Sequence, residues 1–168
     1  MLLGFTALVL GCAPAIHVHS ARSPTAPFDH YRTFAFDASD SAPLGYASSP
    51  RSAEVRGRIR QYAGILLEAK GFALVAADAK PDLVLRVAAG RVERVLRHTV
   101  PPWLEEREDE DFVEGAFVID AFDASTEQLV WHGAARGEAD SNRIDDERLR
   151  RAVASVLATF PARAPALR

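Results

Sequence analysis

Residues 117–135, FVIDAFDASTEQLVWHGAA, decide how this chain folds. Apolar and β-branched residues fill both ends of the stretch, at 117–122 and 129–135, and a short polar segment separates them. Two such runs joined by Asp, Ser and Thr predict an antiparallel β-hairpin. Asp120 and Asp123 flank this hairpin, so we expect them to make turn hydrogen bonds rather than to work as an acid–base pair.

Three more strands are expected before the hairpin. Residues 30–36 are aromatic and β-branched, and residues 72–75 form a second, short apolar run. Pro81 opens a longer strand in which every second residue is apolar. The alternation changes phase after Gly90, which predicts a β-bulge at that glycine.

Two amphipathic helices are expected, over residues 53–70 and 145–160. Ser52 is the expected N-cap of the first helix and Gly71 its C′ residue. Three acidic residues open the second helix, where the helix dipole favours anions. The element order β-α-β-β-β-β-α predicts an α+β fold, a two-layer α/β sandwich with a mostly antiparallel sheet and both helices on one face.

The first helix carries residues that allow more than one interpretation. Gly57 and Gly64 lie seven residues apart and share one side of the helix. One interpretation is that these glycines have no structural role and the helix tolerates them. The other is that a partner backbone approaches the helix closely on this side. Arg56, Arg58 and Arg60 are expected on a solvated face, because no aromatic residues are interleaved with them as single-stranded nucleic acid would need.

The amino-terminal residues predict where in the cell the protein is located. Residues 2–10 are uncharged and mostly apolar, and small Gly11 precedes Cys12, the one cysteine in 168 residues. The tetrapeptide Val9-Leu10-Gly11-Cys12 resembles the lipobox of bacterial lipoproteins. That resemblance implies cleavage before Cys12, a lipid on its sulfur and, since Ala13 follows it, the periplasmic face of the outer membrane. The other interpretation of a lone cysteine is a small buried hydrophobic residue.

The rest of the chain is expected to divide into three parts after a signal peptide at residues 1–11. Prolines and small residues make 12–27 a flexible, lipid-anchored tether, 28–161 a single α/β domain and 162–168 a disordered tail. The net charge of −3 provides no general attraction for nucleic acid or for anionic lipid.

Several segments together resemble a known bacterial family. Phe112–Asp123, which runs from Gly115 into a strand, and Thr126–Ala135, with Leu129-Val130-Trp131 and Gly133, resemble two strands of the domain of unknown function 4136. Further matching pieces are Phe28–Phe36, Glu68–Phe72, Pro81–Leu85 and Phe160-Pro161. The resemblance implies a Gram-negative envelope lipoprotein with no assigned reaction and no catalytic residues to carry over.

An acidic segment is the clearest candidate for an interaction. Pro101 and Pro102 stiffen the chain before Trp103, and a dense run of carboxylates follows it. A solvated loop is the default interpretation, and a basic partner surface is the functional alternative. Trp103 either anchors a protein or glycan contact or packs under the sheet edge. The candidate partner-binding residues are Trp103, Glu105, Glu106, Glu108 and Asp109.

No sequence motif indicates a catalytic reaction or a metal site. The five histidines lack metal-ligand spacing outside the tether, and no second cysteine exists to join Cys12. Nucleophile-elbow, phosphate-loop and dinucleotide motifs are missing. We therefore expect no enzyme, metal or cofactor. The first hypothesis is a non-catalytic envelope lipoprotein that binds an envelope protein partner. The alternatives are a small-molecule-binding module with a cleft between helices and sheet and, more weakly, a hydrolase.

Overall fold

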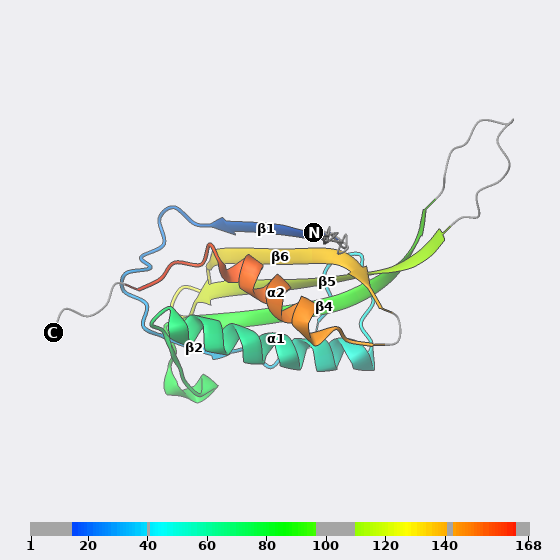
Figure 1. Cartoon of the computed structure of the whole chain (residues 1–168). Coiled ribbons are helices and arrows are strands. Elements are labelled where there is room, and N and C mark those ends of the chain that lie inside the picture. The colour runs from blue at the N-terminus through cyan, green and yellow to red at the C-terminus, as the bar shows by residue number, and fades with distance from the viewer. Residues whose placement is uncertain (1–14, 40, 97–109, 141–142, 164–168) are drawn as a thin grey trace, which may run out of the picture.

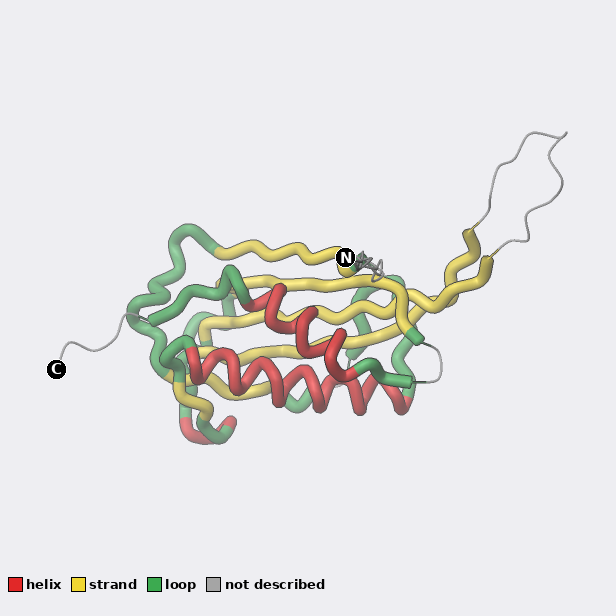
Figure 2. Tube along the Cα trace, viewed as in Figure 1, coloured by secondary structure: helices red, strands yellow, loops and turns green. Residues whose placement is uncertain are grey.

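The computed structural model describes residues 15–39, 41–96, 110–140 and 143–163. These residues form one mixed α/β unit with a six-stranded sheet and two helices (Figure 1). The elements are β1 (Ile16–Arg22), β2 (Thr33–Phe36), α1 (Pro50–Ala69), β3 (Ala73–Leu74), a 3-10 turn (Ala77–Ala79), β4 (Leu83–Leu96), β5 (Glu110–Asp123), β6 (Leu129–Ala139) and α2 (Asp146–Leu157), as Figure 2 shows.

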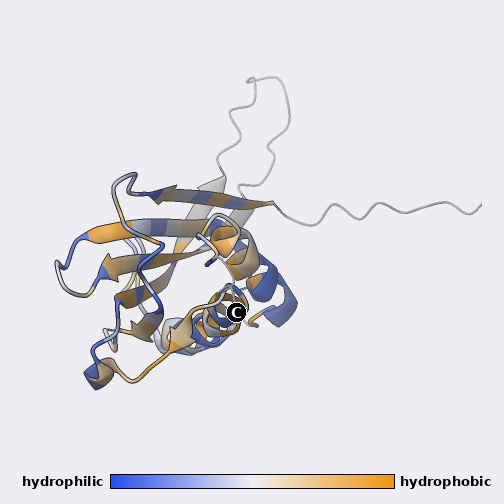
Figure 3. Cartoon of the chain, turned by 90° about the vertical axis from the view of Figure 1, so that its left-hand side faces the viewer, coloured by the Kyte–Doolittle hydropathy of each residue, from blue (hydrophilic) through white to orange (hydrophobic). Residues whose placement is uncertain are grey.

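The sheet has the strand order β1-β6-β5-β4-β2-β3. The pairings β1–β6, β6–β5 and β5–β4 are antiparallel, as expected for most of the sheet. β2 instead runs parallel to both β3 and β4, because α1 crosses over between β2 and β3 and returns the chain in the same direction. Viewed along the strands, both helices lie on the same face of the sheet (Figure 3).

The predicted flexible tether over residues 12–27 is wrong for the seven residues 16–22. Ile16–Arg22 form β1, which pairs with β6 from Ile16 opposite Gly137 to Arg22 opposite Trp131. β1 is an edge strand, and its inward-facing Val18 remains 40% exposed. Because an edge strand buries little apolar surface, the segment lacks the alternation that would have marked it. The folded unit therefore starts near Ile16, not at Phe28.

The predicted bulge at Gly90 is also wrong. The register between β4 and β5 is unbroken there, with Gly90 opposite Ala116, and the irregularity lies between Ala121 and Phe122 of β5. Gly90 is small for another reason: a Cβ atom on it would come within 2.8 Å of the Tyr46 Cβ. The loop before α1 therefore passes directly against β4 at this point.

The ends of the helices refine the predicted boundaries. α1 begins at Pro50 with Ser49 as its N-cap, and Ser52, the predicted cap, instead completes the capping box from the third helical position. Gly71 follows the helix with φ of +92°, as its predicted C′ role requires. Asp145 caps α2, which ends at Leu157 rather than at residue 160.

Arg56 does not lie on a solvated face as expected. Its side chain is 1% exposed, and it donates hydrogen bonds to the carbonyl oxygens of Ser41, at 3.2 Å, and Ala89, at 3.4 Å. The guanidinium thereby joins α1 to β4 and to the loop that precedes α1. The two glycines of α1 show no close backbone approach from another described segment. If a Cβ atom were added to Gly57 or Gly64, no backbone atom of another described segment would lie within 4 Å of it.

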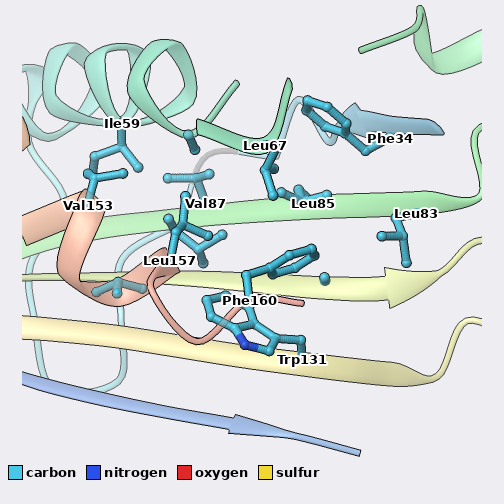
Figure 4. Close-up of a cluster of buried hydrophobic side chains, with 14 of the residues drawn as sticks. Phe34, Ile59, Leu67, Leu83, Leu85, Val87, Trp131, Val153, Leu157 and Phe160 are labelled. Atoms are coloured by element: carbon cyan, nitrogen blue, oxygen red, sulfur yellow. The ribbon is translucent and has the colours of Figure 1, made fainter. Parts of the chain in front are cut away.

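The core lies between the helices and the inner face of the sheet (Figure 4). Trp131 of β6 is 1% exposed, and its ring centroid lies 5.0 Å from that of Phe160, just after α2. Phe28 and Phe72 also meet Phe160 edge-on, at 5.7 and 5.5 Å between centroids. This aromatic cluster fills the end of the molecule where α1 and α2 finish.

Candidate functional site

The residues predicted from the sequence to carry function fall outside the described residues. They are Cys12, Trp103, Glu105, Glu106, Glu108 and Asp109. The backbone on either side of the acidic segment is described, however. β4 and β5 stay paired as far as Leu96 opposite Glu110, so a two-stranded ribbon extends from the body of the sheet to this segment (Figure 1).

A cleft of about 460 Å³ opens at the end of the molecule where the helices begin. It lies between the first turns of α1 and α2 and the inner face of β4, β5 and β6, and Ile16 of β1 also lines it. Its volume falls within the range of roughly 300–1,000 Å³ that is typical of small-molecule sites. A cleft between helices and sheet is the feature that the small-molecule hypothesis requires.

The cleft exists because the sheet extends past the helices and carries small residues there. Five of the residues that line this part of the inner face are glycine or alanine: Ala89, Gly115, Ala135, Gly137 and Ala139. A Cβ atom on Gly115 would lie 3.1 Å from the Ala139 Cβ. One on Gly137 would lie 2.9 Å from the carbonyl oxygen of Ala15 and 3.3 Å from Nη2 of Arg148. The guanidinium of Arg148 therefore lies against the floor of the cleft, where a larger residue would exclude it.

Positive charge outweighs negative charge among the lining residues. Five are arginines and three are carboxylic acids: Arg51, Arg91, Arg136, Arg143 and Arg148 against Glu138, Asp140 and Asp145. Arg51 and Arg148 belong to the first turns of α1 and α2 and are half-buried. Both helices point their amino-terminal ends, which carry partial positive charge, at the same space.

The outer face of the sheet carries a histidine–carboxylate pair. Nδ1 of His132 lies 2.6 Å from Oδ1 of Asp120, and both side chains are about one-third exposed, at 34% and 27%. The ring of His19 lies 6.0 Å from that of His132, between centroids. Among the described residues, no hydroxyl or thiol hydrogen-bonds to His132.

Asp120 and Asp123 have separate roles. The predicted turn role is confirmed for Asp123, whose Oδ1 accepts hydrogen bonds from the hydroxyl and backbone N–H of Ser125 and from the N–H of Thr126. Its Oδ2 accepts one from the Tyr31 hydroxyl at 2.8 Å. These bonds, led by that of the Ser125 hydroxyl, lower the pKa of Asp123 to about 2. Asp120 makes no turn bond and pairs with His132 instead.

Two further properties concern the described part of the chain alone. No group of three or more His, Cys, Asp or Glu side chains there is arranged to hold a metal ion. No helix in the described segments has the length and apolar character needed to cross a membrane.

Sequence reasoning missed the cleft and its arginines. Arg51, Gly115, Gly137 and Arg148 come from four different elements, and no local motif connects them. A signal was nevertheless present, since glycine is unfavourable in a strand interior and marks a close approach or a gap. Gly115 and Gly137 are paired directly across β5 and β6, so the hairpin register alone brings them together.

Comparison with known sequences identifies one family. The family model DUF4136, described as a domain of unknown function, matches residues 18–162. None of the curated proteins matches the chain.

Solved structures share the fold at low sequence identity. PelC of Paraburkholderia phytofirmans, solved as a dodecamer, has a TM-score of 0.55 and 15% identity, with 89% of this chain and 100% of PelC covered. A PDZ domain protein of Parabacteroides distasonis has a TM-score of 0.59 and 16% identity, with 90% of this chain but 37% of that protein covered. A DUF4136 family protein of Bacteroides thetaiotaomicron has a TM-score of 0.49 and 15% identity, over 85% of this chain and 94% of its own.

Proposed function

We propose, on the premise that this chain belongs to the DUF4136 family, that it is a non-catalytic binding protein of the cell envelope. A lipid on Cys12 anchors it to the periplasmic face of the outer membrane, and the domain binds a small molecule in the cleft. The cleft is the observation that carries the binding role, because about 460 Å³ of space is bounded by an apolar floor and charged side chains.

The anchor rests on the sequence around Cys12. An uncharged apolar run ends in Gly11-Cys12, and the described domain begins only a few residues later, at Ile16. A lipid on Cys12 would therefore hold the domain close to the bilayer. Two anchoring signals are usual for stable attachment, and the multiple acyl chains of a bacterial lipoprotein would supply them.

The non-catalytic part rests on the side chains that the cleft presents. Its lining offers arginines, carboxylates and apolar residues, but no His, Cys or Lys among the described residues. The hydroxyls of Ser49 and Ser52 also line it, and they hydrogen-bond to each other in the capping box of α1. General acid–base or nucleophilic catalysis needs a group whose pKa lies near the working pH, or an activated nucleophile. The fold lowers the pKa of four described carboxylates outside the cleft, which keeps them ionised: Asp37, Asp82, Asp123 and Asp146.

Mass spectrometry of the membrane fraction tests the anchor. We expect wild-type protein to start at residue 12 and to carry a mass increment equal to a diacylglyceryl group with an amide-linked acyl chain. The Cys12→Ser variant should lack the increment and leave the membrane fraction. Wild-type protein that keeps residues 1–11 and a free thiol would refute the anchor.

A fragment screen by NMR tests the cleft. Ala139 is the diagonal neighbour of Gly115 on the cleft floor, so Ala139→Leu would fill part of the space. Ala134→Leu on the other face of β6 is the matched control, since that residue is also half-buried. We expect fragments to shift the amides of Gly115 and Gly137 in the wild type and the Ala134 variant, but not in the Ala139 variant. Binding that is insensitive to Ala139→Leu would refute a cleft site.

A second function, binding of an envelope protein through Trp103 and the acidic residues after it, is favoured by the β4–β5 ribbon. The paired ends of β4 and β5, on either side of this segment, extend beyond the helices (Figure 1). PelC, with a similar fold, forms a dodecamer, so copies of the chain are the first partner to test. Light scattering coupled to size-exclusion chromatography should show an assembly that Trp103→Ala dissolves. A wild-type monomer, or an assembly unchanged by the substitution, would refute self-association through Trp103.

A further inference from the structure

We propose that the cleft binds the anionic head group of a lipid-like molecule, a phosphate or carboxylate carried on an apolar chain. This inference rests on the proposed function, because it takes the cleft as a ligand site and Cys12 as the membrane anchor. It adds the class of ligand and the side of the domain that faces the bilayer.

The start of β1 places the cleft next to the anchor. Ile16 lines the cleft, and the carbonyl oxygen of Ala15 lies against Gly137 on its floor. Ile16 is the fourth residue after Cys12, and an extended chain spans at most about 3.6 Å per residue. A lipid on Cys12 is therefore within about 14 Å of the cleft. Had residues 12–27 formed a free tether, the anchor would constrain no particular face of the domain.

The charge of the cleft differs in sign from that of the whole chain. The chain carries a net charge of −3, whereas five arginines and three carboxylic acids line the cleft. The half-buried Arg51 and Arg148 sit in the first turns of the two helices, where the helix dipoles add positive potential. Guanidinium groups bind phosphate and carboxylate oxygens with paired hydrogen bonds, which makes an anion the complementary ligand.

The floor of the cleft explains why a free anion is the weaker fit. Apolar side chains from four different elements also line the cleft: Ile16 of β1, Val55 of α1, Phe117 of β5 and Leu149 and Ala152 of α2. Inorganic phosphate would leave this apolar surface in contact with water. A short alkyl chain would cover it, and each buried CH₂ group strengthens binding by roughly fourfold, from about 0.8 kcal/mol.

Three soluble probes separate the contributions of charge and chain. Hexyl phosphate combines both, inorganic phosphate has the charge alone, and hexanol has the chain alone. Each is titrated by NMR into the full-length, acylated protein in phosphatidylcholine nanodiscs. We expect hexyl phosphate to bind at least tenfold more tightly than either control probe and to shift the amides of Gly115 and Gly137.

Charge-removing variants locate the binding to the cleft. The double variant Arg51→Gln with Arg148→Gln should weaken hexyl phosphate at least tenfold. Arg150→Gln with Arg151→Gln removes the same charge from exposed positions of α2 outside the cleft lining, and it should change the affinity less than twofold. Arg148→Lys keeps the charge but not the paired donors, so we expect an intermediate loss. Circular dichroism and thermal melting show whether each variant is folded.

The outcomes distinguish this inference from the proposed function. Equal affinity for hexanol and hexyl phosphate would leave a binding cleft but overturn its anionic ligand. Equal affinity for inorganic phosphate would overturn the lipid-like ligand and identify a site for a free anion. Weakening by the Arg150/Arg151 control as large as that by the cleft variant would overturn the site. Soluble, unacylated wild-type protein would instead refute the anchor on which the inference depends.

Discussion

The two ends of β6 show how the same strand serves opposite purposes. At one end, Gly133 lies under the ring of Trp131, and a Cβ there would come within 2.2 Å of that ring and 2.5 Å of Val156. At the other end, Gly137 lies beside the guanidinium of Arg148 and the cleft. Both glycines make room, but the first makes room for the protein's own core and the second for a charged group and open space.

The difference follows from the volume that each end supplies. Where α1 and α2 finish, aromatic rings from four segments meet and fill the space between helices and sheet. Where the helices begin, five of the residues on the facing sheet are glycine or alanine, so a cavity remains. Stability should therefore be concentrated at the aromatic end, and binding at the end with the cleft.

Removing the central ring should have the largest effect. Trp131→Ala deletes a side chain that is 1% exposed and contacts Phe160, so we expect the free energy of unfolding to fall by about 3–5 kcal/mol. Urea unfolding followed by circular dichroism measures it. Leu44→Ala, at a fully exposed position, is the control and should change stability by less than about 0.5 kcal/mol. An equal loss of unfolding free energy in the two variants would contradict the concentration of stability at the aromatic end.

The two glycines of β6 allow a direct comparison. Gly133→Ala forces Trp131 or Val156 to move and should destabilise the fold by about 1–3 kcal/mol. Gly137→Ala meets the start of β1 and the end of a long arginine side chain, which adjust more easily, so its loss should be smaller. We expect Gly137→Ala to reduce hexyl phosphate binding and Gly133→Ala to leave it unchanged. Loss of hexyl phosphate binding in Gly133→Ala but not in Gly137→Ala would contradict the assignment of Gly133 to the core and Gly137 to the cleft.

Acid should weaken the aromatic end through Asp123. Its pKa is about 2 in the folded state and 3.8 in a reference peptide, so its stabilisation is complete above about pH 5. Because the folded pKa is the lower one, this contribution, about 2 kcal/mol, is lost as the pH falls from about 5 to about 1. Unfolding curves of wild type and Asp123→Asn should differ at pH 6 and converge near pH 1. A constant difference would refute the role of this carboxylate.

Gly57 of α1 should give the smallest effect, and with the opposite sign. A Cβ atom added to Gly57 would have no neighbouring atom of the described residues within 4 Å. Gly57→Ala should therefore stabilise the fold by about 0.5–1 kcal/mol, because it lowers the backbone entropy of the unfolded chain. Gly64→Ala, whose Cβ would make an ordinary 3.8 Å contact with Phe36, should behave alike. Thermal melting measures both. Destabilisation at Gly57 would indicate a partner that approaches α1 there.

Sequence reasoning succeeded where periodicity and burial coincide. The hairpin of β5 and β6 and the two helices were predictable because each buries one apolar face against the same core. β1 was missed because an edge strand buries little, and the parallel edge was missed because strand direction depends on how α1 crosses the sheet. The prediction of a bulge at Gly90 was wrong. A glycine is required there because the loop that contains Tyr46 packs against it, not because the strand register changes.

The sequence by itself determined the family, the helices, the central hairpin and the cysteine that predicts an envelope address. These depend on residues close together in the chain, whose spacing matches the period of a helix or strand. The tertiary structure alone decided the pairing of Ile16–Arg22 with β6, and the gathering of Arg51, Gly115, Gly137 and Arg148 around one cleft. Such a site has no local signature, because packing joins elements that the chain keeps apart.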